Sequence, residues 1–246
     1  DKIAAFSAVF PGHSIDESSF STTVASKLSL NQYLEDYSNI NIADVIQKVL
    51  YHQEMPLQSS SVVLQYMLFQ KAAQEGVKVL IDGQGADECW GGYATHVSWH
   101  LQHLFRNNYK RFQTEKKQLL ENGFINSFTW KHYVAAWLPE KAAKKRQEKA
   151  IQEQLNHPHL NPDFYAAYYN DDALMQPVIK ALDDSLYHDL VDGPLQVLLR
   201  FGDRNAMAHG IELRLPYLSP QLVSFAFSLQ PEKKINQGYT KWLLRE

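Results

Sequence analysis

Residues 82–93 read DGQGADECWGGY, and they directly follow residues 77–81 (VKVLI), a short apolar run with the composition of a buried strand. Ligands of open parallel sheets bind beyond the carboxyl ends of the strands, where this segment lies. Gly83 and Gly85 permit left-handed backbone angles and a close approach of the main chain to a ligand. Successive backbone N–H groups, together with a helix that begins near Ala86, attract an anion. The segment therefore predicts a phosphate-binding loop.

Two acidic residues, Asp87 and Glu88, stand at the start of the helix that follows the loop. Carboxylates repel phosphate, but a Mg²⁺ ion removes the conflict because it takes one or two carboxylates together with phosphate oxygens. Alternatively, both acids only stabilise the positive end of the helix, where each contributes less than ~1 kcal/mol. The residues alone leave both interpretations open.

Strand-like and helical patterns alternate over the first third of the chain. Helix after strand in this order predicts an α/β fold with a parallel sheet flanked by helices. After Tyr93 the sequence favours helices, so we expect one domain over residues 1–246, with an α/β part at 1–93 and a largely helical part at 94–246. The expected strands are residues 3–10, 32–37 and 77–81, and the expected helices are 16–30 with Asp16 as N-cap, 42–52, 59–76 and 240–246.

Composition excludes several classes of function. The chain has 246 residues, a formal net charge of -3 and one cysteine, Cys89. This charge argues against nucleic acid and anionic membranes as partners. No apolar run approaches the ~20 residues that span a bilayer. A single cysteine suits a reducing compartment, so we expect a cytoplasmic protein.

Both ends of the sequence look cut. The chain begins without a methionine, directly in an expected strand, and it stops at Glu246 inside an expected helix. We therefore expect it to be a part of a longer polypeptide.

Four segments, in order along the chain, resemble the synthetase domain of glutamine-hydrolysing asparagine synthetases. Residues 79–93 (VLIDGQGADECWGGY) are similar to that family's loop, and residues 101–194 resemble the family least. The other three segments are residues 6–12 (FSAVFPG), 203–219 (DRNAMAHGIELRLPYLS) and 238–246 (GYTKWLLRE). The resemblance implies an adenine-nucleotide alpha-hydrolase-like fold of the PP-loop type.

The resemblance also implies chemistry. Such domains use ATP and Mg²⁺ to convert a side-chain carboxylate into an acyl-adenylate, which ammonia then attacks. Asp87 would bind Mg²⁺, and Lys241 would bind the phosphates and stabilise the leaving pyrophosphate. Asp203 falls where the family keeps an acid near the reacting carboxylate. The residues implied around the nucleotide are Ala8 near the adenine, and Asp82, Gly83 and Gly85 through the loop backbone.

This sequence departs from the family's pattern at several points. The pyrophosphate motif Ser-Gly-Gly-x-Asp-Ser, which belongs upstream of residue 1, is not in the sequence, so we expect this chain to be inactive alone. Gln84 stands where asparagine synthetases usually carry an acid, and an amide cannot serve as a general base. Ser219 replaces an aspartate, but with Pro220 it can still start a helix. The family's glutaminase domain, which supplies ammonia, is also absent from residues 1–246.

Several of these residues also have structural interpretations. Lys241 could be an exposed helix lysine, and Asp203 could pair with Arg204 or Arg214. Glu212 and Arg214 fit a structural pair, His209 fits a core histidine, and Cys89 fits a small buried residue. Spacing puts the histidines on one helical face, which leaves a zinc site open as a minor alternative; they are His96, His100 and His103.

The leading hypothesis is an ATP-dependent ligase that adenylates a carboxylate, most simply that of aspartate, and yields asparagine, AMP and pyrophosphate. One alternative is a tailoring amidotransferase or cyclase that acts on another carboxylate, which Gln84 keeps open. Another is a catalytically silent relative that binds a nucleotide or a partner. The expected partners are ATP, a carboxylate and ammonia from a glutaminase domain, and a homo-oligomer stays open.

Overall fold

The computed structural model describes residues 3–155, 158–159, 161–168 and 177–246. The chain divides into two compact units. The strand unit comprises residues 1–84 and 196–216, and the helical unit comprises residues 85–195 and 217–246. Whether the two form the single domain that the sequence predicts stays a prediction.

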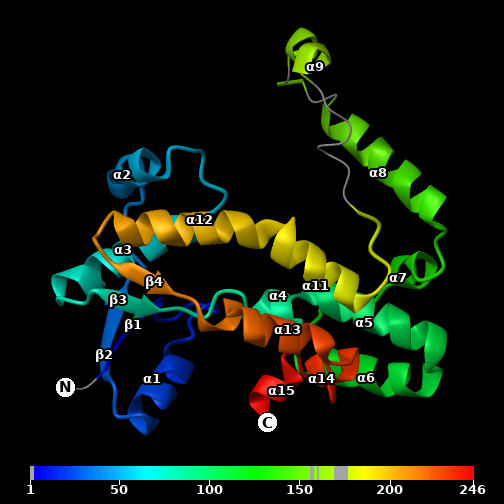
Figure 1. Cartoon of the computed structure of the whole chain (residues 1–246), viewed down its shortest axis with the longest axis horizontal. Coiled ribbons are helices and arrows are strands. Elements are labelled where there is room, and N and C mark those ends of the chain that lie inside the picture. The colour runs from blue at the N-terminus through cyan, green and yellow to red at the C-terminus, as the bar shows by residue number, and fades with distance from the viewer. Residues whose placement is uncertain (1–2, 156–157, 160, 169–176) are drawn as a thin grey trace. The chain divides into compact units, whose positions relative to one another are not determined.

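Two short parallel strand pairs make up the sheets of the strand unit (Figure 1). β1 (Ala4–Val9) pairs with β2 (Asn31–Asp36) in a register that sets Ala4 opposite Asn31. β3 (Val79–Ile81) pairs with β4 (Glu212–Arg214), with Val79 opposite Glu212. The α/β class with parallel strands is therefore confirmed, and three of the four strands lie where the sequence predicts them.

Four helices belong wholly or mostly to the strand unit: α1 (Ser18–Lys27), α2 (Ala43–Gln53), α3 (Ser61–Gln74) and α12 (Pro194–Met207). Asp16 ties the end of β1 to the start of α1, because its Oδ1 accepts hydrogen bonds from the backbone N–H of Phe10 and of Ser18. These bonds favour the ionised carboxylate and lower the pKa of Asp16. The N-cap residue of α1 is Glu17, so the prediction of Asp16 as N-cap is wrong by one residue, and Asp16 supports the helix start from the position before it.

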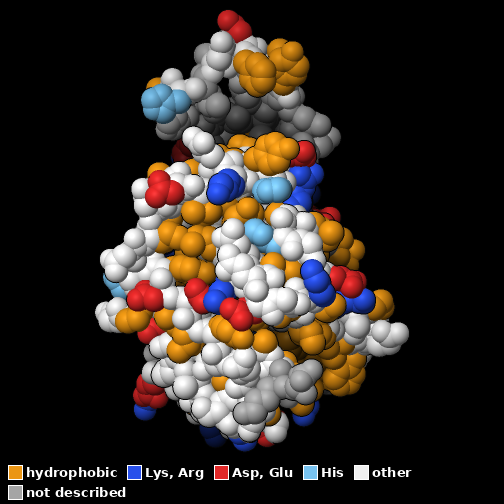
Figure 2. All heavy atoms as spheres, turned by 90° about the vertical axis from the view of Figure 1, so that its left-hand side faces the viewer, with side chains coloured by type: hydrophobic (Ala, Val, Ile, Leu, Met, Phe, Trp, Pro, Cys, Tyr) orange, Lys and Arg blue, Asp and Glu red, His pale blue; other side chains and the backbone are white. Residues whose placement is uncertain are grey.

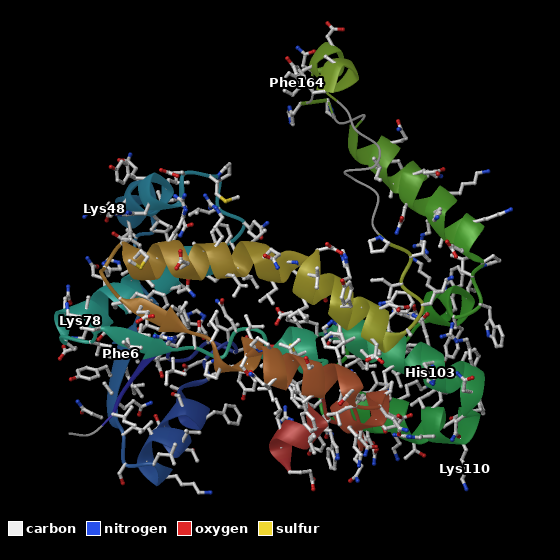
Figure 3. The ribbon with its side chains drawn as sticks, viewed as in Figure 1. Phe6, Lys48, Lys78, His103, Lys110 and Phe164 are labelled. Carbon is white, nitrogen blue, oxygen red and sulfur yellow. The ribbon has the colours of Figure 1, made fainter. Side chains whose placement is uncertain are left out.

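One apolar cluster joins both strand pairs of this unit to their helices. Phe69 and Ala72 of α3 pack with Ala206 and Ile211, and the strands add Phe6, Leu80 and Leu213. Phe6, labelled in Figure 3, also stacks on Tyr33 of β2 with ring centroids 4.9 Å apart. The cluster fixes β3, and with it the start of the glycine-rich loop.

The helical unit has a core of its own, made of Val97, Leu101, Leu104, Phe112, Leu119, Ile125, Leu182, Leu186 and Ile235. Its elements are α4 (Ala86–Trp90), α5 (Ala94–Asn107), α6 (Tyr109–Glu121), α7 (Trp130–Ala135), α8 (Glu140–Leu155), α9 (Pro162–Tyr168), α11 (Leu182–Val191), α13 (Pro220–Ser228), α14 (Pro231–Lys234), α15 (Trp242–Arg245) and most of the 3₁₀ turn η1 (Pro216–Leu218).

The start of α13 is the helix end at which a serine replaces the aspartate usual in the family. Ser219 caps α13 by accepting from Leu222 N, with Pro220 in the first turn, so the substitution of aspartate by serine preserves the helix start.

None of the helices in the described parts is both long and apolar enough to span a bilayer. Figure 2 shows hydrophobic side chains exposed among charged ones on the face that it draws.

Candidate nucleotide-binding site

The first half of the loop continues the line of β3. Asp82 N donates to Arg214 O at 3.0 Å, one residue beyond the paired strands. Gly83 is exposed, and its N–H donates to Asp82 Oδ1 at 2.6 Å. A Cβ at Gly83 would meet no heavy atom within 4 Å, so the backbone here is open to a ligand. Gly83 does not use the left-handed backbone region that its glycine permits.

Gly85 does use that region, with φ +91°. Within the helical unit, a Cβ on Gly85 would also lie 2.3 Å from Leu218 Cδ2. Both the backbone angle and the packing therefore require glycine. The helix that follows, α4, has only five residues. Its macrodipole is accordingly much weaker than that of a full-length helix, so the backbone of the loop is a better basis for anion binding than the helix end.

The two acids of α4 have different environments. Glu88 is 2% exposed, and its Oε1 accepts a hydrogen bond from the Tyr93 hydroxyl at 2.5 Å. Burial and this carboxylate raise the pKa of Tyr93. Asp87 is half-buried, and its Oδ1 lies 2.8 Å from Lys241 Nζ. Glu88 therefore has a structural role. Of the two acids, Asp87 is the one that a cation, the ammonium group of Lys241, already contacts.

Gly92 makes room for the Asp87 carboxylate. A Cβ at Gly92 would lie 1.5 Å from Asp87 Oδ1, which no rearrangement short of moving the carboxylate can relieve. The N–H groups of Gly91 and Gly92 both donate to Asp87 O at 3.0 Å, so the chain folds back over this residue. Sequence analysis missed this role, since it depends on the rotamer of a side chain five residues earlier.

Lys241 lies at the start of α15 with φ +52°, in the left-handed region. A lysine has a Cβ and rarely adopts this conformation, which costs of order 1–3 kcal/mol. The side chain of Lys241 is 29% exposed and that of Asp87 is 35% exposed. The ammonium group of Lys241 points at the Asp87 carboxylate. The alternative interpretation, an exposed helix lysine, would instead have the side chain lie along the surface.

The buried side chain of His96 connects the end of the loop, at Tyr93, to α11. Tyr93 N donates to His96 Nδ1 at 3.3 Å, so the proton of a neutral ring lies on Nε2, which donates to Asp189 Oδ2 at 2.8 Å. His96 is fully buried. Burial lowers its pKa, and the nearby Asp189 only partly opposes this effect. We call Tyr93, His96 and Asp189 the Asp189 brace, because it ties the end of the loop to α11.

Three amide side chains form a hydrogen-bonded row within the strand unit, and the Oε1 atom of Gln84 lies buried near its end without a partner among the described residues. Gln53 Nε2 donates to Asn205 Oδ1 at 2.8 Å, and Asn205 Nδ2 donates to Gln65 Oε1 at 3.0 Å. A Cβ at Gly202 would lie 3.8 Å from Gln65 Nε2 and 3.5 Å from Gln84 Oε1, so these two atoms flank the same point. We call Gln53, Asn205 and Gln65 the amide ladder.

The remaining predicted site residues lie in the strand unit. Ala8 stands on β1 opposite Glu35 and is half-buried. Asp203 is exposed on α12 and makes no ion pair in the part of the chain that the structure describes. The arginines proposed as its partners pair elsewhere: Arg204 with Glu54 at 2.7 Å, and Arg214 with Glu212 at 2.8 Å.

The structural interpretation of Asp203 is therefore wrong, whereas the Glu212–Arg214 pair is confirmed. His209 lies beside Tyr66 with ring centroids 4.3 Å apart, as a core histidine would. Cys89 is fully buried, and burial raises the pKa of its thiol to about 11, which leaves it unreactive.

The zinc alternative finds no support. Within the described ranges no group of three or more His, Cys, Asp or Glu side chains could hold a metal ion. His96 is committed to the Asp189 brace. His100 is buried with neither ring nitrogen bonded, and the ring of His103, labelled in Figure 3, contacts Asn107 Nδ2 through its Nδ1 at 3.4 Å.

The strand unit is of the α/β class with parallel strands, and β3 runs directly into the glycine-rich loop. The match to known families is more specific: the Asparagine synthase family matches residues 1–246, and the chain belongs to that family.

The chain is similar to bacterial proteins named as glutamine-hydrolysing asparagine synthetases, or as putative ones. The chain is 24% identical over 265 aligned positions to Asparagine synthetase [glutamine-hydrolyzing] 1 of Bacillus subtilis (strain 168), covering 98% of this chain and 39% of that protein. It is 25% identical over 209 positions to Putative asparagine synthetase [glutamine-hydrolyzing] of Mycobacterium bovis and of Mycobacterium tuberculosis, covering 80% of this chain and 31% of those proteins. The chain thus spans well under half the length of these relatives.

Proposed function

We propose that the complete protein is an ATP-dependent ligase that adenylates a carboxylate and passes the acyl group to ammonia. The observation that carries the proposal is the pairing of Asp87 with Lys241 at the glycine-rich loop. Family membership supports amide formation as the reaction type. Aspartate is the substrate that the names of the relatives favour, with asparagine, AMP and pyrophosphate as products.

The roles follow the chemistry of each side chain. The loop backbone at Asp82, Gly83 and Gly85 contacts the AMP half of the nucleotide, with Ala8 beside the adenine, although the N–H groups of Asp82 and Gly83 already donate to Arg214 O and Asp82 Oδ1. Lys241 neutralises phosphate oxygens as a point charge and stabilises the pyrophosphate as it leaves. Asp203 is free of ion pairs within the described residues, which suits an acid placed near the reacting carboxylate.

Asp87 fits a magnesium ion as a single carboxylate ligand. Mg²⁺ binds proteins through one or two carboxylates and takes its other ligands from water and phosphate. Glu88 does not fit, because its carboxylate is buried and bonded to Tyr93. A bound Mg²⁺ would supply charge neutralisation for the phosphates. Lys241 would then turn from Asp87 towards phosphate.

The PP-loop type of fold is also part of the proposal. Within the described residues β1 pairs only with β2 and β3 only with β4, while Phe6 of β1 and Leu80 of β3 share one apolar cluster. Two parallel pairs on one core, each with a free edge, accept a further parallel strand that joins them. We infer that polypeptide upstream of residue 1 supplies this strand with the pyrophosphate motif, and that residues 1–246 alone are inactive.

ATP–pyrophosphate exchange by the complete protein tests the proposal. Exchange that depends on L-aspartate supports asparagine synthesis with ammonia from a glutaminase domain. Exchange only with another carboxylate supports the tailoring alternative. If no acid of a broad panel supports exchange, the remaining alternative is a catalytically silent protein that binds a nucleotide or a partner. Asp87→Asn and Lys241→Met should each lower exchange at least ~100-fold if they act on the transferred charge. The surface changes Asp44→Asn and Lys48→Met are matched controls (Figure 3).

A further inference from the structure

The turn that follows α4 closes over the Asp87 carboxylate. Asp87 Oδ1 fills the space where a side chain at position 92 would begin, because a Cβ on Gly92 would lie 1.5 Å from it. The N–H groups of Gly91 and Gly92 donate to Asp87 O. The Tyr93 hydroxyl donates to Glu88 Oε1, in the same helix as Asp87. The position of this turn therefore limits the orientations that are open to the Asp87 side chain.

The Asp189 brace fixes the end of the same turn. Tyr93 is the N-cap of α5, and its N–H donates to the side chain of His96 three residues later, as in a capping box. His96 Nε2 then donates to Asp189, which belongs to α11, and α11 packs against both α4 and α5. Each bond has one direction, because a backbone N–H only donates and a carboxylate only accepts. A continuous line of hydrogen bonds thus runs from α11 to the turn.

The brace reaches Asp87 through this turn alone. Among the described residues, neither His96 nor Asp189 makes a hydrogen bond or an ion pair with Asp87. The ring of His96 is fully buried and the side chain of Asp189 is 16% exposed, so water does not readily replace either partner. Holding the ring fixes the nitrogen of Tyr93, and Tyr93 adjoins the glycine that touches the carboxylate.

We propose that His96 and Asp189 are positioning residues that hold the Asp87 carboxylate in the orientation that meets a cation. The proposal rests on the proposed function for one point, the role of Asp87 as a magnesium ligand. Removing the outer partners of a metal site commonly costs ~10–100-fold in metal affinity. Loss of the brace should therefore raise the requirement for Mg²⁺ and leave the affinity for the carboxylate substrate nearly unchanged.

Amide hydrogen exchange of the complete protein tests the brace without any catalytic activity. Asp189→Leu should speed exchange of the Tyr93 amide at least ~10-fold, because His96 loses the partner that orients its ring. Asp189→Asn keeps an acceptor for the Nε2–H group and should behave like the unaltered protein. Asp192→Leu, exposed at the end of α11, is the matched control. Urea denaturation of each variant separates local opening from global unfolding.

ATP–pyrophosphate exchange at saturating ATP and carboxylate then gives the free Mg²⁺ concentration at half-maximal rate. That concentration should rise ~10-fold in Asp189→Leu and stay near the unaltered value in Asp189→Asn. KM for the carboxylate should change less than ~2-fold. Gly92→Ala displaces the Asp87 carboxylate directly, without touching the buried ring, and should have at least as large an effect. Combining Gly92→Ala with Asp189→Leu should add little, because both act at one contact.

The outcomes separate the two proposals. If Asp189→Leu leaves the Tyr93 amide as protected as before, the brace does not hold the turn and the inference is overturned. The inference also fails if that amide opens but the Mg²⁺ requirement is unchanged, or if the effects of Gly92→Ala and Asp189→Leu add in full. If the unaltered protein shows no ATP–pyrophosphate exchange with any carboxylate, the proposed ligase function fails, and the magnesium role fails with it whatever the amide exchange shows.

Discussion

The amide ladder of the strand unit and the charged contacts of the helical unit place polar side chains away from water in different ways. The ladder uses neutral amides, and backbone carbonyls set its direction. The helical unit uses charged or titratable groups, among them Asp87 with Lys241 and His96 with Asp189. Neutral networks are insensitive to pH and salt, whereas charged ones respond to both. The comparison therefore predicts separate responses of the two units.

The largest effect is expected at an ion pair of the helical unit whose lysine is buried and whose aspartate, Asp183, is 45% exposed. Lys234 is fully buried, and its Nζ lies 2.5 Å from Asp183 Oδ1. Asp183→Asn leaves the ammonium without a counter-charge, which should lower the free energy of unfolding by about 3 kcal/mol. Urea denaturation measures this, with the exposed Asp192→Asn as the control of equal charge change. Equal midpoints for the two variants would show that the pair is not needed.

A slightly smaller effect is expected at the centre of the amide ladder. Asn205→Leu leaves Val62 O and Gln65 Oε1 without their donor, which should cost about 2–3 kcal/mol of unfolding free energy. The loss should be the same at pH 5 and pH 8, since no member of the ladder titrates. Asn126→Leu, at an exposed position, is the control. A loss that changes with pH would contradict the neutral description of this unit.

The sequence predicted the local features of the site better than its long-range ones. Three local features of the site follow from neighbouring residues or from the family pattern. They are the strand before the loop, the glycine at position 85, and a glutamine at position 84 where the family usually has an acid. The pairing of Asp87 with Lys241 joins residues 154 positions apart, and only the resemblance placed both in one site.

The features that sequence analysis missed depend on side-chain packing. Asn205 meets Gln53 and Gln65 across 152 and 140 positions, and single buried amides carry no periodic signal. Asp189 likewise has no motif that links it to His96. The requirement for glycine at position 92 appears only once the Asp87 rotamer is known. Such contacts are set by tertiary packing, so no local pattern predicts them.

A third prediction concerns pH in the helical unit. Burial, with the charges of Arg111 and His103 nearby, lowers the pKa of His100 to about 3. In the unfolded chain a histidine titrates near pH 6.5, so below that pH the unfolded state binds the extra proton. Stability should be complete above about pH 6.5 and fall by ~1.4 kcal/mol per pH unit below it, towards the folded pKa.

His100→Leu isolates this contribution, because it removes a buried ring whose two nitrogens have no partner among the described residues. Unfolding free energies at pH 7, 6 and 5 should fall less steeply for the variant than for the unaltered protein. His96, whose pKa burial also lowers, remains in both proteins and accounts for a residual slope. An unchanged slope in His100→Leu would mean that the ring is accessible to protons when folded.

The smallest effect is expected where the strand unit does carry charge. Glu212 and Arg214 pair at 2.8 Å on β4, but their side chains are 58% and 64% exposed. Exposed pairs contribute ~0–1 kcal/mol because water and salt screen them, so Glu212→Gln should shift the unfolding midpoint barely measurably, and less still in high salt. A loss comparable to that of Asn205→Leu would show that charge, and not the neutral ladder, secures β4 against β3. The contrast between the neutral amide ladder and the charged contacts would then no longer explain the stability of the strand unit.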